Sequence, residues 1–296
     1  MAATNGGQTH QSQTSQGSQT SPYLTPLEPS FVNTEPQDEF VREIADWIAF
    51  ISGGRPDIEI EAKFGAVLDK NSGTRTAQRL GILVETILDP RDASGIRFES
   101  ALSPKQHEHL NRMLNDRVAA TASTSYAFAP LAARHLVTTD EFFPAPSSHS
   151  HNDGGDGKLR VTRDDKTGQL VDCIIKRRLG DLHVLSPKRE VDWRISVNVE
   201  EKVDVGVVGG SARALYSRRK DRMEYTHQHF HIDLTQVSDN AGVKTHELEL
   251  EFAFPHEVRR VLELRGRDGP EMWGYDQLMA VFVNNCRILS RNIIRK

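Results

Sequence analysis

The sequence predicts an α+β protein: a closed antiparallel β-barrel, topologically a tunnel, with a charged interior and an outer face covered by helices. Two segments far apart in the chain, 58–65 and 246–252, alternate acidic residues with apolar residues. A period of two is the signature of a strand with two different faces. A third segment, 192–200, alternates mixed polar residues with apolar ones. Segments with helical spacing flank these strands, so helices are available to cover the apolar faces.

Composition and charge restrict the class of protein. The chain has 296 residues, 37% hydrophobic and 26% charged, which suffices for one large domain or two small ones. The net charge of −4 argues against a protein that binds nucleic acid through bulk positive charge. Cys173 and Cys286 are the only cysteines, so no disulfide framework is indicated and a reducing compartment fits better. No apolar run approaches the roughly 18 residues of a membrane span, and no signal peptide is recognisable, so we expect an intracellular protein.

The chain begins with a predicted disordered tail, which a single folded domain follows. Residues 1–34 are rich in Gln, Ser and Thr, and they cannot bury enough apolar surface to offset the entropy of ordering. We therefore place the folded domain at 35–296. Apolar residues recur at three- and four-residue spacing over 38–52 and predict a helix. The first acidic strand follows it directly.

The rest of the domain alternates between one further helix, a run of strands and a final helix. A helix is predicted over 104–119, with Ser103 as its N-cap and Pro104 as its first residue. The segment 149–157 is rich in Ser, Asn, Asp and Gly, and predicts a loop. Residues 158–254 predict successive strands, and 275–294 has the apolar spacing of a packed helix.

The polar faces of these strands are sorted by charge. The two acidic strands gather glutamates on one face, whereas the strand at 218–222 gathers arginine and lysine. Carboxylates in a row repel each other unless cations lie among them. Sorted charge would be costly in an ordinary sheet, but it makes sense in a barrel whose charged faces point inward. The apolar faces would then point outward, beneath the three predicted helices.

The predicted interior suits a polyanionic phosphate chain and a divalent metal ion. Glutamates from two strands offer hard oxygen ligands for Mg²⁺ or Mn²⁺. Basic side chains on other strands offer donors for phosphate oxygens; they are Arg160, Lys176, Arg218, Lys220 and Arg222. A metal ion at the terminal phosphate would neutralise developing charge. Glu200 lies on a different strand from the metal set, so it is the candidate to hold the attacking water.

Five strand motifs occur in a characteristic order. They are Glu59-Ile60-Glu61-Ala62-Lys63, the strand from Asp192 to Glu200, Arg218-Arg219-Lys220-Asp221-Arg222, Asp233-Leu234-Thr235, and the glutamates Glu247, Glu249 and Glu251. In these motifs the chain resembles, over roughly residues 35–295, the fungal RNA 5′-triphosphatases. These are the beta subunits of the yeast-type mRNA capping apparatus and belong to the triphosphate tunnel metalloenzymes. One Glu-x-Glu-x-Lys motif is weak evidence, whereas five in order are specific.

The resemblance implies a hydrolase that removes the γ-phosphate from the 5′-triphosphate end of nascent mRNA and leaves a diphosphate end, the first step of capping. It implies that Glu59, Glu61 and Glu251 bind the metal ion directly, and that Glu247 and Glu249 support the metal site. It implies phosphate contacts from the five basic residues named above and a water-orienting role for Glu200. Asp233, like Asp192 and Arg194, would belong to the ion-pair lattice of the site.

The resemblance also raises expectations about partners. It implies a nuclear protein that binds the mRNA guanylyltransferase, and a possible homodimer. Relatives carry a short Trp-rich docking peptide before the catalytic domain, and the first 35 residues here contain no Trp. His231 stands where the family commonly has arginine, and histidine lacks the permanent charge and forked donor of arginine. We interpret His227, His229 and His231 as ordinary strand histidines, because no further ligand completes a zinc site.

Two alternative functions stay open at this point. The same tunnel chemistry would serve an enzyme that hydrolyses inorganic tripolyphosphate, thiamine triphosphate or nucleoside triphosphates. A non-catalytic module that binds polyphosphate or RNA ends is the alternative from another class. The five glutamates argue against it, because simple binding of an anion would not favour them.

Overall fold

The computed structural model describes residues 27–145, 158–208, 213–267, 269 and 273–295. The chain divides into two compact units, Met1–Asp38 and Glu39–Lys296. The helices and strands of the described residues all lie in the second unit. Most of the predicted tail 1–34 and all of the predicted loop 149–157 lie outside the described residues. Among the described helices, none has both the length and the apolar character needed to cross a membrane.

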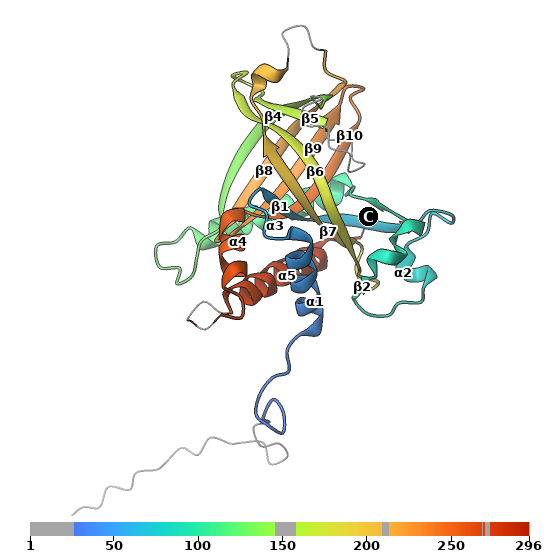
Figure 1. The fold of residues 1–296 in the computed structure, drawn as a ribbon, viewed down its shortest axis with the longest axis vertical. Helices are drawn as coiled ribbons and strands as arrows, with labels where there is room; N and C mark the ends of the chain where they lie inside the picture. Colours follow the sequence, from blue (N-terminus) through green and yellow to red (C-terminus); the bar gives the residue numbers. More distant parts are fainter. Residues whose placement is uncertain (1–26, 146–157, 209–212, 268, 270–272, 296) are drawn as a thin grey trace, which may run out of the picture. The chain divides into compact units, whose positions relative to one another are not determined.

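The second unit is built around eight antiparallel strands that close into a barrel (Figure 1). They are β1 (Ile58–Asp69), β4 (Ala132–Pro144), β5 (Lys158–Asp164), β6 (Leu170–Leu185), β7 (Asp192–Lys202), β8 (Tyr216–His227), β9 (Phe230–Asp239) and β10 (Lys244–Phe252). Their order around the barrel is β10-β9-β8-β4-β5-β6-β7-β1, and β1 pairs with β10 to close it. Two short strands, β2 (Thr86–Leu88) and β3 (Ile96–Glu99), extend the sheet beside β6 and β1. The predicted closed barrel is confirmed.

The main hydrophobic core lies outside the barrel wall, as the sequence predicts for a barrel with a charged interior. On β7, Trp193, Ile195 and Val197 are fully buried on the outer face, while the alternate residues point inward. The outward apolar residues of β1 and β10 join the same cluster. Burying this apolar surface is the dominant favourable contribution to folding. Because it is buried against helices, the interior of the barrel is left to charged side chains.

Five α-helices accompany the barrel among the described residues. They are α1 (Glu39–Ser52), α2 (Thr76–Arg79), α3 (Pro104–Thr121), α4 (Pro255–Leu264) and α5 (Gly274–Asn292), with 3-10 helices at Pro90–Gly95 and Val205–Val207. Helix α5 contacts both α1 and α4, all three contact the strands, and they lie together beneath the barrel in Figure 1. The start of α3 is the predicted one: the Ser103 side chain accepts from the backbone N–H of Gln106 in a complete capping box. Helix α4 was missing from the sequence prediction, although Pro255 marks its first turn.

Strand β1 changes its neighbour half-way along. Residues 61–63 pair with β10, whereas residues 66–69 pair with β3. Gly65 lies at the change, where a Cβ atom would come within 1.9 Å of the backbone oxygen of Glu99. Only glycine lets the two backbones approach this closely. The residue therefore joins the first barrel strand to the extension formed by β3.

Candidate active site

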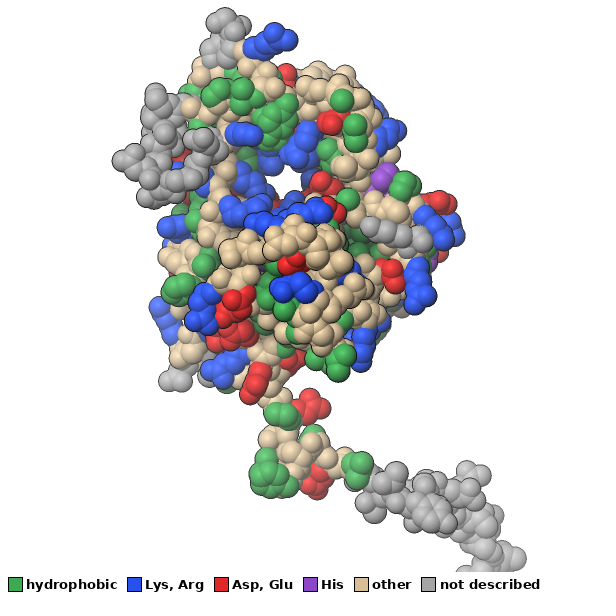
Figure 2. Space-filling model, turned by 90° about the vertical axis from the view of Figure 1, so that its right-hand side faces the viewer, with side chains coloured by type: hydrophobic (Ala, Val, Ile, Leu, Met, Phe, Trp, Pro, Cys, Tyr) green, Lys and Arg blue, Asp and Glu red, His purple; other side chains and the backbone are tan. Residues whose placement is uncertain are grey.

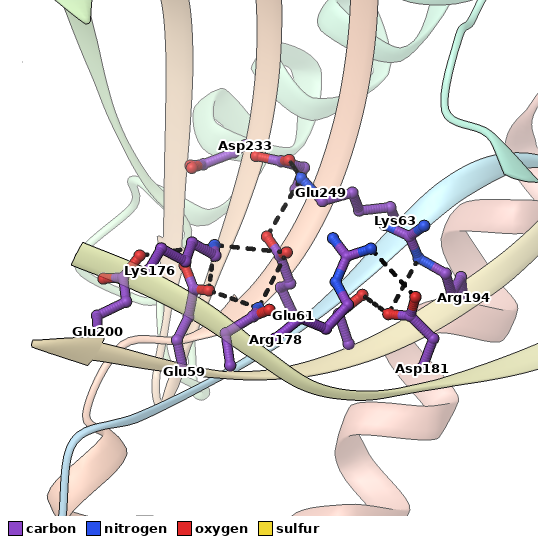
Figure 3. Close-up of polar contacts among 12 residues, drawn as sticks. Glu59, Glu61, Lys63, Lys176, Arg178, Asp181, Arg194, Glu200, Asp233 and Glu249 are labelled. Carbon is purple, nitrogen blue, oxygen red and sulfur yellow. Dashed lines mark hydrogen bonds and ion pairs between the residues drawn. The ribbon is translucent and has the colours of Figure 1, made fainter. Parts of the chain in front are cut away.

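The strand register brings acidic side chains from β1, β7 and β10 together inside the barrel. Glu61 lies opposite Ser196 of β7 on one side and opposite Glu251 of β10 on the other. Glu249 lies opposite Lys63 of β1 and Asp233 of β9. The strict alternation of these strands gives all of these side chains the same inward face. Strands separated by almost the whole domain therefore build one acidic wall (Figure 3).

Two lysines lie among the glutamates of this wall. The ammonium group of Lys176, on β6, forms ion pairs with Glu59 and, at 3.5 Å, with both Glu61 and Glu200. The ammonium group of Lys63 pairs with Glu249 and lies 3.3 Å from Glu61. Figure 3 shows Lys176 drawn into the space between Glu59, Glu61 and Glu200. The predicted requirement for cations among the carboxylates is therefore met by these two side chains.

The charges of Lys63 and Glu249 stabilise each other. Burial alone would lower the pKa of Lys63, but Glu249, Glu61 and Glu247 outweigh it and raise that pKa above its ordinary value. Burial would likewise raise the pKa of Glu249, but Lys63, Arg222 and Lys220 lower it. Both groups are thus charged at neutral pH, because each holds the other in its ionised form.

Glu251 has no such partner. Its carboxylate forms no hydrogen bond or ion pair within the part of the chain that the structure describes, and its neighbours across β1 and β9 are Glu61 and His231. Burial raises the pKa of Glu251 well above its ordinary value, the charges of Asp233 and Glu59 raise it further, and Arg222 opposes them. A buried carboxylate surrounded by other carboxylates is unfavourable unless a cation joins them.

A basic wall on β5 and β8 faces the glutamates. Arg222 pairs with Asp233 at 2.5 Å, Lys220 pairs with Asp140 at 2.8 Å, and Arg160 lies 3.4 Å from Glu200. Burial lowers the pKa of Lys220, although Asp140 opposes this shift. Figure 2 shows a hollow in the molecular surface with Lys and Arg side chains gathered along its rim. The cavity is therefore electropositive toward an entering anion.

The residues present fit a hard divalent metal ion. Within the described residues, no three acidic, histidine or cysteine side chains are already arranged to hold a metal ion. The reason is visible around Glu59 and Glu61, where the ammonium group of Lys176 occupies the space between their carboxylates. The donor set of Glu59, Glu61 and Glu251 consists of carboxylate oxygens only, which Mg²⁺ and Mn²⁺ prefer. Glu251 also lacks the cation that its surroundings favour.

Comparison with known proteins identifies the family. A family profile described as "mRNA capping enzyme, beta chain" matches residues 34–295. The chain belongs to this family. The resemblance drawn from the five strand motifs is thereby confirmed.

Two relatives in this capping-enzyme family are both named mRNA-capping enzyme subunit beta. The Schizosaccharomyces pombe protein is 30% identical over 90% of this chain and 85% of its own length. The Cryptococcus neoformans protein is also 30% identical over 90% of this chain, which spans only 65% of that protein. A solved structure of the S. pombe Pct1 RNA triphosphatase in complex with the Spt5 CTD has a TM-score of 0.80 at 29% identity, covering 90% of this chain and 99% of that one. A second Pct1 structure has a TM-score of 0.78 at 28% identity, covering 91% of this chain and 99% of that chain.

The motifs of this capping-enzyme family converge in one interior, with one correction. Asp192 is fully buried, but its carboxylate pairs with Arg75 and accepts from the backbone N–H groups of Val67 and Ser186. None of these partners is a tunnel residue, so Asp192 fixes loops at the end of the barrel and is not part of the tunnel lattice. Arg194 does belong to the lattice, since it lies 3.6 Å from Asp181 of β6.

His231 forms polar contacts within the tunnel wall. Its ring nitrogen Nδ1 lies 3.0 Å from the Thr226 hydroxyl and 3.6 Å from Glu224. Burial lowers the pKa of His231, and the charges of Arg134 and Arg222 lower it further against the effect of Glu224. The ring is therefore neutral at pH 7. Arg134 of β4 binds both oxygens of Glu224, at 2.5 and 2.9 Å, and supplies a permanent charge beside His231.

Sequence reasoning missed four polar residues of the interior. Asp140 and Glu224 are the buried partners of Lys220 and Arg134. Asp181 accepts a hydrogen bond from the Ser196 hydroxyl and forms an ion pair with Arg194. Asn198 donates to Glu59 at 2.9 Å and to Glu61 at 3.4 Å. Asn198 could have been found from its inward register on the predicted strand. Glu224 could likewise have been found, because it continues the inward row of Arg218, Lys220 and Arg222. Asp140 and Asp181 carry no repeating pattern, and only the order of the strands brings them to their partners.

Proposed function

We propose that this chain removes the γ-phosphate from the 5′-triphosphate end of nascent mRNA and leaves a 5′-diphosphate end, with Mg²⁺ or Mn²⁺ as cofactor. One observation carries the proposal: a tunnel in which a glutamate wall, with the carboxylate of Glu251 unpaired among the described residues, faces a basic wall. Membership of the capping-enzyme beta-chain family supports the RNA end as the substrate. The metal ion would be held by Glu59, Glu61 and Glu251, with Glu247 and Glu249 supporting them.

The basic side chains would bind and orient the triphosphate. Arg222 and Lys220 project from β8, and Arg160 from β5 lies close to both Glu200 and Asp140. Guanidinium groups match phosphate oxygens in a forked geometry, whereas lysine acts as a point charge on a flexible stem. Lys176 can therefore exchange a glutamate for a phosphate oxygen without a change in the backbone. Neutralising the phosphate oxygens from several strands at once favours the charge distribution of phosphoryl transfer.

Glu200 would orient the attacking water. Its Oε1 atom lies 3.4 Å from Arg160 and 3.5 Å from Lys176, and these cations hold the carboxylate in place. A carboxylate oxygen accepts the hydrogen bond of a water and can take its proton as the water attacks. When bound, Mg²⁺ or Mn²⁺ supplies charge neutralisation at the transferred phosphate. The direction of attack is thus set by β7, opposite the basic side chains of β8.

The direct test is phosphate release from γ-labelled triphosphate-ended RNA with Mg²⁺, with Mn²⁺ and with chelator. We expect release that depends on either metal and stops with chelator. Inorganic tripolyphosphate and ATP are assayed beside the RNA. Better turnover of tripolyphosphate than of RNA ends would favour the polyphosphatase alternative, and tight binding without release would favour the non-catalytic module.

Replacing Lys220 by alanine should lower kcat/KM for triphosphate-ended RNA by about 10- to 100-fold, since a charge-assisted hydrogen bond to phosphate is lost. Asp140 would keep its hydrogen bond from the Thr162 hydroxyl at 2.7 Å, so the fold should survive. The matched control is Arg219→Ala. Arg219 is the preceding residue on the opposite face of β8, where it pairs with Asp165. Steady-state kinetics that show no difference between the two variants would remove Lys220 from the site.

Metal affinity should weaken as the pH falls. Burial raises the pKa of Glu251, so its carboxyl group holds a proton at a higher pH than an ordinary glutamate does. A metal ion needs the carboxylate, so binding must displace that proton. We expect the Kd for Mn²⁺ to be higher at pH 6 than at pH 8, with a limit of about tenfold per pH unit for one displaced proton. Calorimetry in two buffers should also detect proton release; a Kd that is equal at both pH values would contradict the assignment.

Partners and location follow from the family only. We propose that the chain works in the nucleus together with an mRNA guanylyltransferase, which would receive the diphosphate end. The S. pombe Pct1 structure contains the Spt5 CTD, a partner of that protein. A homodimer stays a prediction, and size-exclusion chromatography with light scattering would test it.

A further inference from the structure

Four side chains form a continuous stack at one end of the basic wall. The rings of Phe142 and Tyr216 are stacked, with centroids 4.4 Å apart and an interplanar angle of 15°. The guanidinium carbon of Arg218 lies 4.8 Å from the centroid of Phe142, and the Lys158 ammonium lies 4.9 Å from the centroid of Tyr216. The order is therefore Arg218, Phe142, Tyr216, Lys158, a pair of rings with a cation on each side.

The stack belongs to the inner face of the barrel. Phe142 lies two residues along β4 from Asp140, the buried partner of Lys220, whereas the next residue, Phe143, packs in a cluster on the outer face. Phe142 and Tyr216 are direct partners in the β4–β8 pairing. Tyr216 thus continues the inward row of β8 beyond Arg222, Lys220 and Arg218, about 13 Å along the strand from Lys220.

The other end of the stack lies beside the acidic wall. Lys158 is the cross-strand partner of Lys176, which pairs with Glu59 and Glu200. A molecule on the Lys158 side of Tyr216 would thus lie one strand from Lys176, two strands from Glu200, and in line with the basic row of β8. The distance of about 13 Å along β8 between Lys220 and Tyr216 is the length scale of a nucleoside attached to its triphosphate.

The Lys158 side chain covers one face of the Tyr216 ring, and a ligand could displace it. Lys158 is the first residue of β5, its side chain is exposed, and within the described residues it forms no ion pair. A cation–π contact at an exposed site contributes only about 0.5–1 kcal/mol. The opposite ring face is fixed, because Phe142 is 8% exposed and is itself covered by Arg218. Tyr216 therefore offers one rigid aromatic face behind one mobile charge.

We propose that Tyr216 is the stacking platform for the base of the 5′-terminal nucleoside, and that Lys158 moves from the ring to the phosphates when that nucleoside enters. Base stacking on an aromatic ring is tolerant of sequence, since every base has a π face. The inference rests on the proposed function and adds a nucleoside subsite to it. It gives the tunnel a means to favour nucleoside 5′-triphosphates, whether at an RNA end or free, over inorganic polyphosphate.

Replacing Tyr216 by leucine should raise KM for triphosphate-ended RNA and for ATP by roughly 5- to 100-fold, the range of base–aromatic stacking. The apparent affinity for inorganic tripolyphosphate, measured as substrate or as competitor, should stay unchanged and shows that the tunnel is intact. Tyr216→Phe keeps the ring and should behave as wild type. The matched control is Tyr126→Leu: Tyr126 packs against Phe128 and lies 5.4 Å from the Arg117 guanidinium, in the segment between α3 and β4.

A binding measurement separates this inference from the proposed activity. We use RNA with 2-aminopurine as its 5′-triphosphate nucleotide. Its fluorescence should be quenched when it binds to saturating wild-type protein in EDTA, and should not be quenched when it binds to the Tyr216→Leu variant. Absence of quenching on wild-type protein would overturn the subsite. An equal loss of affinity for RNA and tripolyphosphate in the Tyr216→Leu variant would also overturn it. A loss for RNA without a loss for ATP would overturn it too, because Tyr216 would then contact a later nucleotide of the RNA. Metal-dependent phosphate release by wild-type protein stands as a separate result in each case.

Discussion

Alanine in place of Glu251 should reduce phosphate release from triphosphate-ended RNA by more than about 100-fold, because residues that merely support a metal site already contribute 10- to 100-fold. Glu59→Ala should have the same effect. Each change removes one carboxylate donor from a proposed set of three, and alanine offers no oxygen ligand in its place. Metal-dependent release under saturating Mn²⁺ is the measurement, and retained activity in either variant would contradict the assignment of ligands.

The Glu251→Ala substitution should leave the stability of the protein unchanged or increase it. Burial and the neighbouring carboxylates disfavour the charged form of Glu251, so removing it relieves repulsion in the metal-free protein. The matched control is Glu201→Ala. Glu201 lies on the opposite face of β7 from Glu200 and pairs with Arg177 at 3.4 Å. Thermal unfolding in EDTA should show Glu251→Ala at or above wild type; a lower Tm would mean that the carboxylate stabilises the empty tunnel.

Alanine in place of Gly65 should destabilise the protein by at least about 2–3 kcal/mol. Its Cβ would lie 1.9 Å from the Glu99 oxygen and 2.8 Å from the Glu99 carbonyl carbon, both backbone atoms that no rotamer change can move. Strands β1 and β3 would have to separate where β1 exchanges β10 for β3. Urea unfolding at equilibrium measures the loss.

Gly95→Ala provides the comparison for this prediction. Gly95 directly precedes β3, and a Cβ atom there would meet nothing within 4 Å. Its free energy of unfolding should stay within about 0.5 kcal/mol of wild type, as for most surface substitutions. Equal stability of the two variants would show that β3 can shift away from β1 at low cost.

Much of this fold could be predicted because its strands carry their orientation in the sequence. Alternation on 58–65, 192–200 and 246–252 gives one charged and one apolar face, and only an inverted barrel reconciles the sorted charges. The predicted helices agree with α1, α3 and α5 to within two residues at each end. Helix α4 was overlooked although Val258, Val261 and Leu262 have helical spacing and pack on the core.

The ion pairs of the tunnel could be predicted only in part. Glutamates that repeat along one strand are recognisable, whereas Asp140 lies beside Glu141 in a mixed segment of β4 that has no acidic alternation. Its importance comes from the position of β4 between β8 and β5, which depends on long-range pairing. Asp192 was misassigned for a related reason. Its parity is that of the tunnel residues, but β7 has left the tunnel at that point and β1 is turning toward β3.

Closure of the barrel by β1 and β10 imposes an order on biosynthesis. Glu61 finds its partner Glu251 about 190 residues later in the chain, which takes roughly 10–40 s at ordinary rates of synthesis. Until β7 is synthesised, about 130 residues after Glu61, β1 lacks both of its barrel neighbours, and it then waits for β10. Strands this distant in sequence lose loop-closure entropy before any contact between them compensates for it, so their pairings form slowly. The first motif to leave the ribosome is therefore among the last to be protected, and the acidic wall can exist only once the chain is almost complete.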